Sequence, residues 1–312
     1  MTIAPFAQST VPPASPDAGV AIRLPYRPPF DWPVLLGFLG PRAIPGVEMV
    51  EGECYRRTIA LDGRHGVVEV RPGEGALEAI IRFPVAGALG AIAERLTRQF
   101  DLAADAAAID AHLARDPLLA PLVAARPGLR VPGAWEPFEL AVRAILGQQI
   151  SVAAATVLAG RVAACYGTPL RLDDGAPPPG LSHVFPGPAD LTGADPGILR
   201  VPGARAAAIA GLAATLVREP DLLSPEQSLD DSVARLCRLP GIGPWTAHYV
   251  AMRALRASDA FPAGDLGLRK AAATPDGVPA LKVLEARAES WRPWRAYAAI
   301  HLWFSLAATQ GG

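Results

Sequence analysis

Residues 239–250 read LPGIGPWTAHYV, and this stretch decides how the second half of the chain is interpreted. The preceding run SLDDSVARLCRL has apolar residues at helical spacing, with Ser228 in position to cap it and two aspartates in its first turn. A proline ends that run, Gly241 and Gly243 permit a tight turn with positive φ, and a second proline suits the start of a new helix. The sequence therefore predicts two helices joined by a short turn, with Ile242 inserted between them.

The glycine-rich turn has two interpretations. Free N–H groups at the start of a helix bind anions, so the arrangement is similar to the helix-hairpin-helix element, which holds DNA phosphates without reading sequence. In that case the phosphate site comprises Gly241, Ile242, Gly243 and Thr246. A plain corner between two packed helices would use the same residues. The later segment FPAGDLGLRKA favours the first interpretation, because it places Asp265 in a glycine-flanked loop beyond the second helix.

The rest of the chain reads as an α+β protein. Residues 21–103 contain short strand-like runs, CYRRTIAL, HGVVEVRP and LEAIIRFP, followed by the helical run VAGALGAIAERLTRQF. From about residue 104 onward the apolar spacing is helical. The Pro/Gly/Asp-rich loop 167–188 is too poor in periodic apolar residues to predict a core element, and residues 1–20 are predicted to be a disordered tail.

Composition places further limits on function. The formal net charge of −1 argues mildly against a dedicated nucleic-acid binder, although basic residues outnumber acidic ones from Asp231 onward. The three cysteines are far apart and fit neither a disulfide framework nor a CxxC metal pattern, which favours the cytoplasm. No signal peptide or long apolar span is evident, so we expect no membrane partner.

The order of hairpin, helix and isolated loop aspartate resembles the HhH-GPD superfamily of DNA glycosylases. Within it, five segments are similar to the DNA-3-methyladenine glycosylase II (AlkA-type) family: RPPFDWPVLLGFLGPRAIPGVE, ARPGLRVPGAWEPFELAVRAILGQQISVA, FPGPADLTGADP, LPGIGPWTAHYVAMRALRASDAF and WRPWRAYAAIHLWF. The resemblance implies an N-terminal TATA-binding-protein-like domain at 21–107. It also implies a helical domain at 132–257 that contains the hairpin, and a second one, formed by 108–131 and 258–312, that completes the cleft.

The resemblance implies a monofunctional DNA glycosylase of base excision repair. Such an enzyme flips alkylated bases such as 3-methyladenine or 7-methylguanine out of double-stranded DNA, hydrolyses the N-glycosidic bond and leaves an abasic site. It is expected to act as a monomer and to require no cofactor. The alternative from another class is a helix-hairpin-helix protein that binds DNA without catalysis.

Asp265 is the candidate catalytic residue, because a fixed carboxylate can stabilise the positive charge that the sugar acquires as the base leaves. Trp245 and Tyr249, four residues apart, lie on one helix face, and aromatic faces stack on a cationic base. By resemblance the pocket comprises Trp245, Tyr249, Phe38, Trp303 and Leu266. The other interpretations are helix capping for Asp265 and core packing for the aromatic residues.

Two further roles follow from the resemblance. Gln149, with Gln148 beside it, corresponds to the residue that fills the gap left by the flipped base, although hydrogen bonding within the loop would also suit a glutamine. The main-chain carbonyls of Cys237, Leu239 and Ile242 correspond to ligands of a structural Na⁺ or K⁺ ion.

Two features indicate the branch of the superfamily: the residue at the position of the lyase lysine, and the number of cysteines. Members that also cleave the strand use a lysine early in the second hairpin helix as a Schiff-base nucleophile, and here Trp245 stands there. We therefore expect no lyase activity. The four-cysteine motif of the endonuclease III branch is absent, so no iron–sulfur cluster is expected. Gly264 and Leu266 mark departures, because the family can carry an acidic residue at the first place and an aromatic residue at the second.

Overall fold

The N-terminal part of the protein is an antiparallel sheet. A computed structural model describes residues 19–173, 175–275 and 277–309. The predicted tail therefore lies outside the described residues except at its end, where Val20 already begins the first strand. The sheet has the order β1-β5-β4-β3-β2, and its strands are β1 (Val20–Pro25), β2 (Glu48–Glu51), β3 (Cys54–Leu61), β4 (Arg64–Gly73) and β5 (Ala76–Arg82).

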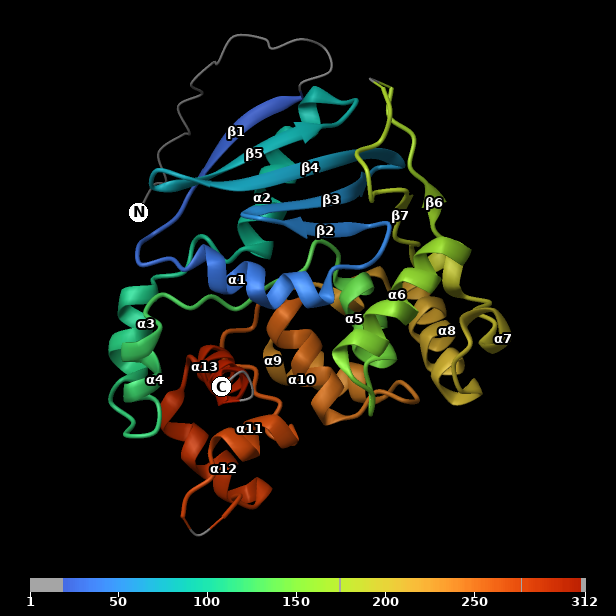
Figure 1. Ribbon diagram of the computed structural model, residues 1–312. Coiled ribbons are helices and arrows are strands. Elements are labelled where there is room, and N and C mark those ends of the chain that lie inside the picture. Colours follow the sequence, from blue (N-terminus) through green and yellow to red (C-terminus); the bar gives the residue numbers. More distant parts are fainter. Residues whose placement is uncertain (1–18, 174, 276, 310–312) are drawn as a thin grey trace.

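Apolar side chains from the sheet pack against two helices. Tyr55 on β3 lies opposite Val70 on β4, and both are completely buried. They share a core with Ile92 and Leu96 of α2 (Leu89–Gln99), which lies behind the sheet in Figure 1, and with Trp32 of α1 (Trp32–Leu39). The three predicted strands and the predicted helix are confirmed, whereas β1, β2 and α1 were not predicted.

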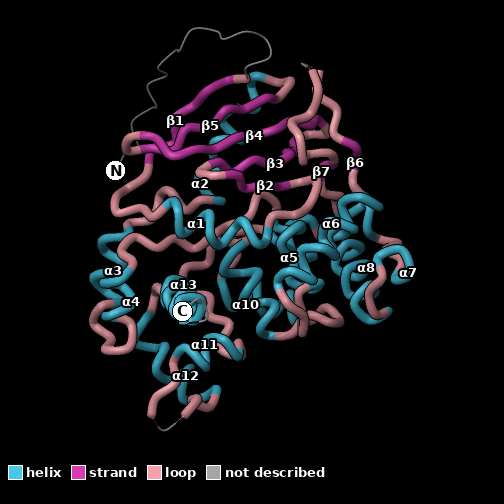
Figure 2. The backbone as a smooth tube through the Cα atoms, viewed as in Figure 1, coloured by secondary structure: helices cyan, strands magenta, loops and turns pink. Residues whose placement is uncertain are grey.

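The remainder is mainly helical, and Figure 2 shows the strands gathered at one end and most of the helices at the other. Residues 135–167 form two helices separated by a loop at residues 147–151. The helices are α3 (Ala106–Leu113), α4 (Ala120–Ala125), α5 (Pro137–Leu146), α6 (Val152–Tyr166), α7 (Pro196–Leu199), α8 (Gly203–Arg218), α9 (Leu229–Cys237), α10 (Pro244–Arg253), α11 (Leu266–Ala271), α12 (Leu281–Ala288) and α13 (Arg295–Thr309), with 3₁₀ turns η1 (Gly40–Arg42), η2 (Ala86–Ala88), η3 (Pro188–Leu191), η4 (Pro220–Leu223) and η5 (Glu289–Trp291).

One apolar core runs through these helices. It includes Ile145 of α5, Val250 of α10 and Ile300 of α13, each of them completely buried. The predicted division of the helical part into two domains therefore stays a prediction. Residues between α3 and α4 pack against the C-terminal helices, since Asp116 forms an ion pair with Arg287 of α12 at 2.7 Å.

The loop at 167–188 was predicted to form no core element. This prediction was wrong, because part of the loop packs against the sheet. It forms a short ribbon of β6 (Thr168–Pro169) and β7 (His183–Val184) that returns to the N-terminal sheet. Leu181 and Val184 are buried there in a small cluster with Val67 of β4. Thr58 of β3 donates to the carbonyl of His183 at 2.9 Å. A few apolar residues at the right places suffice for docking, because the sheet supplies the rest of the cluster.

Buried ion pairs join the sheet to the helices. Arg57 on β3 and Glu139 on α5 are both 2% exposed, and their side chains lie 2.7 Å apart. Burial alone would lower the pKa of Arg57, but Glu139, Tyr55 and Glu48 raise it. A buried guanidinium left without such partners would be strongly destabilising, so the two parts are held in one relative position.

Two general features bear on the class of protein. No helix among the described residues has the length and apolar character needed to cross a membrane. The three cysteines, Cys54, Cys165 and Cys237, are free thiols in the structure.

Candidate active site

The predicted hairpin is formed by α9 and α10. Ser228 caps α9 by accepting the N–H of Asp231 at 3.1 Å. Gly241 has a φ of +82°, and a Cβ there would lie 2.7 Å from the Cβ of Ala208 on α8, so only glycine fits. Gly243 was expected to share this freedom, but its φ of −92° is ordinary and it precedes α10 as the capping residue. Ile242 is 4% exposed within the helical core, as expected.

The other predicted phosphate-binding positions differ in exposure. Gly241 and Gly243 are exposed on the hairpin. The side chain of Thr246 is buried, and its hydroxyl accepts a hydrogen bond from the amide of Gln148 at 3.1 Å. Any contact of this segment with a phosphate therefore depends on the backbone of the exposed glycines.

Aromatic side chains from two helices form one wall of a cavity. The rings of Trp245 and Tyr249, one turn apart on α10, are stacked with their centroids 5.3 Å apart and their planes at 12°. Trp303 of α13 meets Tyr249 edge-on at 6.1 Å. Stacked and edge-on pairs are favourable arrangements of aromatic rings. These ring contacts therefore fix the shape of the wall.

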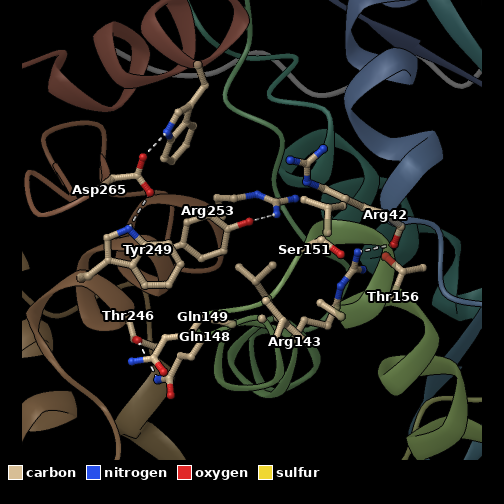
Figure 3. Close-up of a pocket in the computed structure, with 18 of the residues that line it drawn as sticks. Arg42, Arg143, Gln148, Gln149, Ser151, Thr156, Thr246, Tyr249, Arg253 and Asp265 are labelled. Carbon is tan, nitrogen blue, oxygen red and sulfur yellow. Dashed lines mark hydrogen bonds between the residues drawn. The ribbon is translucent and has the colours of Figure 1, made fainter. Parts of the chain in front are cut away.

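Asp265 stands at one end of this wall (Figure 3). Its Oδ2 accepts the indole N–H of Trp245 at 2.9 Å, and its Oδ1 accepts that of Trp303 at 3.0 Å. Oδ1 also accepts the backbone N–H of Leu268 at 2.9 Å, which caps α11. Asp265 thus has the capping role that the sequence left open, while its catalytic role stays a prediction. The capping bond fixes the carboxylate, and the indoles fix the direction in which it points.

The cavity has a volume of about 1450 Å³ and is lined by all five of the predicted pocket residues and by Asp265. It lies between α1 with η1, the loop that joins α5 to α6, and helices α10, α11 and α13. Phe38 belongs to the core of the N-terminal sheet and also lines the cavity, so packing and pocket roles coincide. Leu266 is 56% exposed, at the rim.

The two glutamines of the loop 147–151 are placed differently. The side-chain amide of Gln148 donates to the carbonyl of Gly241 at 2.9 Å as well as to Thr246, so it ties the loop to the hairpin. Arg205 of α8 donates to the backbone carbonyl of Gln148 at 2.6 Å. Gln149 is exposed beside the cavity and has a φ of +59°, an unusual conformation for a side chain of this size.

The predicted cation ligands lie where the hairpin turns. Cys237 ends α9, and the carbonyl of Leu239 accepts the N–H of Ile242 at 3.1 Å within the turn. Carbonyl oxygens have two lone pairs, so this bond leaves capacity for a cation. The cation site stays a prediction.

Three arginines that line the cavity were missed in the sequence. Arg253 of α10 donates to the hydroxyl of Tyr249 at 2.6 Å, and its guanidinium lies 4.8 Å from the centre of the Phe38 ring. Arg42 and Arg143 lie nearby. A signal for Arg253 was available, because it continues the spacing of Trp245 and Tyr249 by four more residues. No such spacing links Arg42 or Arg143 to the hairpin, because these residues belong to η1 and α5.

The arginines change the chemistry of the phenol. Burial alone would raise the pKa of Tyr249, but the charges of Arg253, Arg42 and Arg143 and the hydrogen bond from Arg253 outweigh it and lower the pKa. Tyr249 therefore presents its hydroxyl to these cations as an acceptor and its ring face to Trp245.

Comparisons with known proteins fit this arrangement. Residues 21–136 match the AlkA N-terminal domain family. The chain is 38% identical over 287 residues to DNA-3-methyladenine glycosylase 2 of Escherichia coli K12, which covers 90% of this chain and 95% of that protein. It is 41% identical over 295 residues, or 94% of its length, to a probable bifunctional transcriptional activator/DNA repair enzyme AlkA of Mycobacterium tuberculosis H37Rv, of which it spans 58%.

Solved structures show the same fold. A 3-methyladenine DNA glycosylase from Archaeoglobus fulgidus superposes with a TM-score of 0.75 at 24% identity, over 91% of this chain and 97% of that one. An 8-oxoguanine glycosylase/lyase of Clostridium acetobutylicum, in complex with double-stranded DNA, gives a TM-score of 0.63 at 17% identity, over 86% and 99%. At these identities the structures support the fold, and the relationship to the E. coli protein along nearly its whole length supports the family. The chain therefore belongs to the DNA-3-methyladenine glycosylase 2 (AlkA-type) family of the HhH-GPD DNA glycosylases.

Proposed function

We propose that the protein is a monofunctional DNA glycosylase of base excision repair. It flips an alkylated base, such as 3-methyladenine or 7-methylguanine, out of double-stranded DNA and hydrolyses the N-glycosidic bond, leaving an abasic site. The observation that supports this most strongly is the carboxylate of Asp265, fixed by Trp245 and Trp303 at the edge of an aromatic cavity.

The proposed chemistry needs no general acid, because an alkylated purine that carries a positive charge is already a good leaving group. As the base departs, positive charge develops on the sugar. A carboxylate that is already oriented stabilises that charge without reorganising, and it can position or deprotonate the attacking water. The flipped base stacks on the aromatic wall, with a cation–π contribution of about 0.5 to 2 kcal/mol.

The proposed DNA contacts divide between two loops. The hairpin at Gly241 and Gly243 grips a phosphate through its backbone, with a Na⁺ or K⁺ ion on the carbonyls of Cys237, Leu239 and Ile242 as structural help. Gln149 enters the gap in the duplex. The side chain of Gln148 is hydrogen-bonded to the hairpin and so holds the loop 147–151 and the hairpin in a fixed relative position.

We also propose that the protein has no lyase activity and requires no catalytic cofactor. Trp245 occupies the place of the lyase lysine, and neither Lys270 nor Lys282 is among the described residues that line the cavity. Three cysteines in the chain cannot supply the four thiolates of an iron–sulfur cluster. The protein is proposed to act as a cytoplasmic monomer, since one chain provides a whole site.

The decisive experiment is to incubate the protein with methylated duplex DNA and to measure the free bases released. Release of 3-methyladenine or 7-methylguanine by the wild type, and not by Asp265→Asn, would support the proposal. Binding to damaged duplex without any release would favour the alternative, a non-catalytic helix-hairpin-helix DNA-binding protein.

A further inference from the structure

The cavity has opposite charges at its two ends. Asp265 stands at one end, and Figure 3 shows Arg42 on the far side of Tyr249 and Arg253 from it. Arg42, Arg143 and Arg253 all line the cavity. Cations are an unexpected lining for a pocket that receives positively charged bases, so their presence calls for a reason other than attraction to that charge.

Two of these arginines are fully engaged with the protein. Arg143 pairs with Glu48 at 2.9 Å and with Glu139 at 3.4 Å. Arg253 donates to the carbonyls of Pro132 at 2.7 Å and Gly133 at 3.2 Å in addition to Tyr249. Their donors hold the loop before α5 and the wall of the cavity in place.

Arg42 is different. Its guanidinium donates to the carbonyl of Phe38 at 3.0 Å and lies 3.9 Å from the centre of the Phe38 ring. Within the described part of the chain it forms no ion pair with a carboxylate. Burial and the charges of Arg253 and Arg143 lower the pKa of Arg42. The charge of Tyr249 and a side-chain hydrogen bond with Tyr249 act against this lowering of the pKa. Since a guanidinium has five N–H donors and no acceptor, Arg42 has donors to spare for a ligand in the cavity.

We infer that Arg42 is a specificity-determining residue that donates to the C6 edge of the flipped base, and that it favours purines with a carbonyl oxygen there over purines with an amino group. The inference rests on the proposed glycosylase function. In a purine bound with N9 towards Asp265, the C6 substituent lies on the remote side, towards Arg42. A carbonyl oxygen accepts a hydrogen bond from the guanidinium, whereas an amino group offers only more donors and leaves the free guanidinium N–H groups without an acceptor on the base.

The test compares bases that differ mainly at this edge. Duplexes carry 7-methylguanine or 7-methyladenine, which are both methylated at N7, both cationic and both released from N9, but have a carbonyl and an amino group, respectively, at C6. A third duplex carries hypoxanthine, which has the carbonyl without the charge. Excision is measured in single turnover with enzyme in excess, for the wild type, Arg42→Met and Arg42→Lys.

The expected result is that Arg42→Met lowers the ratio of 7-methylguanine to 7-methyladenine excision by about 10- to 100-fold. Hypoxanthine should fall together with 7-methylguanine, and Arg42→Lys, which keeps the charge but loses the planar fork, should lie between. An equal loss on all three bases, or an unchanged ratio in Arg42→Met and in Arg42→Lys, would overturn the inference. If the wild type released none of the three, the proposed function itself would fail.

A matched control is available in Arg126. Its guanidinium donates to the carbonyl of Phe304 at 3.1 Å and lies 5.4 Å from that ring, so it repeats the two contacts of Arg42 with Phe38. Arg126 is not among the residues that line the cavity. Arg126→Met should therefore leave the ratio unchanged, and a similar shift in this variant would show that loss of packing alone alters selectivity.

Discussion

Trp303 Nε1 lies 3.0 Å from Oδ1 of Asp265, although 38 residues separate the two in the sequence. The pair joins the start of α11 to the last helix, and it brings the candidate catalytic carboxylate against the aromatic wall. Its energetic value is testable, because the chain contains a similar indole–carboxylate pair elsewhere: Trp291 Nε1 lies 2.8 Å from Oδ2 of Asp116.

Trp303→Phe keeps an aromatic ring and removes the N–H donor to Asp265. A hydrogen bond to a charged group is worth about 1.5 to 3 kcal/mol, so we expect single-turnover excision to fall about 10- to 100-fold. Trp291→Phe removes the matching bond between two residues that do not line the cavity, and should lower the melting temperature without lowering excision by folded protein. Similar excision losses in both variants would show that Trp303 acts through general stability.

Asp265→Asn should lower excision by about 10²- to 10³-fold, because the charge that faces the developing cation is removed. Capping of α11 should persist, since asparagine can still accept from Leu268. Its amide nitrogen cannot accept the indole N–H of Trp245, however, so a loss of about 1 to 3 kcal/mol in stability is also expected. The control is Asp195→Asn, which alters a capping aspartate that accepts from Gly197 and Ile198 of α7, outside the cavity. Full activity in Asp265→Asn would remove this residue from the mechanism.

Substitutions of the two loop glutamines should have different effects, one on excision and the other on stability. Gln149→Ala removes an exposed side chain, so we expect about a tenfold loss of excision with no loss of stability. Gln148→Ala removes the bonds to Gly241 and Thr246 and should lower stability by about 1 to 2 kcal/mol. Fluorescence of 2-aminopurine beside the lesion reports flipping, and urea unfolding reports stability. A reversed pattern would exchange the two roles.

Absence of a Schiff base should be visible directly. Borohydride reduction during turnover should trap no covalent complex between the protein and DNA, because no lysine among the described residues lines the cavity. A known bifunctional glycosylase, run in parallel, shows that trapping works. A cross-linked band that requires both lesion and borohydride would contradict the proposal.

Stability should depend on pH through Asp116. Burial alone would raise the pKa of its carboxyl, but hydrogen bonds from Arg287, Trp291 and the N–H of Leu118 hold the pKa below its usual value. A depressed pKa in the folded state means that the contribution to stability is complete above the unfolded pKa of about 4, and is lost as the pH falls through the folded pKa.

Asp116→Asn should therefore cost about 1 to 3 kcal/mol at pH 7, and this difference from the wild type should shrink towards pH 3. Urea unfolding of both proteins between pH 7 and pH 3 measures it. A difference that stays constant over this range would mean that the charge of Asp116 contributes nothing.

Local patterns predicted the local parts of this structure. The strand-like run CYRRTIAL matches β3, and the spacing of Trp245 and Tyr249 correctly placed both rings on one face of α10. Resemblance supplied Phe38 and Trp303, which no periodicity links to the hairpin. The strand β2 is only four residues long, too short for a pattern to emerge.

What the sequence could not supply is contact between distant elements. Arg42 reaches the cavity from a 3₁₀ turn after α1, and its importance depends on which donors Arg143 and Arg253 have already used. Likewise, the ribbon at 168–184 became a packed element because the sheet offers Val67 as a partner. These contacts depend on tertiary packing, and neither segment has a periodic sequence pattern that predicts them.

The packing of the ribbon, β6 and β7, against the sheet limits how these segments can change in evolution. The N–H of Ser182 bonds to the carbonyl of Gly46 at 2.8 Å, and Thr58 bonds to His183, so a segment from the middle of the chain completes the N-terminal part. If recombination replaced the sheet alone, Ser182 and His183 would lose their hydrogen-bond partners. The apolar side chain of Leu181 would lose the surface against which it packs. Sheet and ribbon are therefore expected to be exchanged together or to diverge together, even though Thr58 and His183 lie 125 positions apart in the sequence.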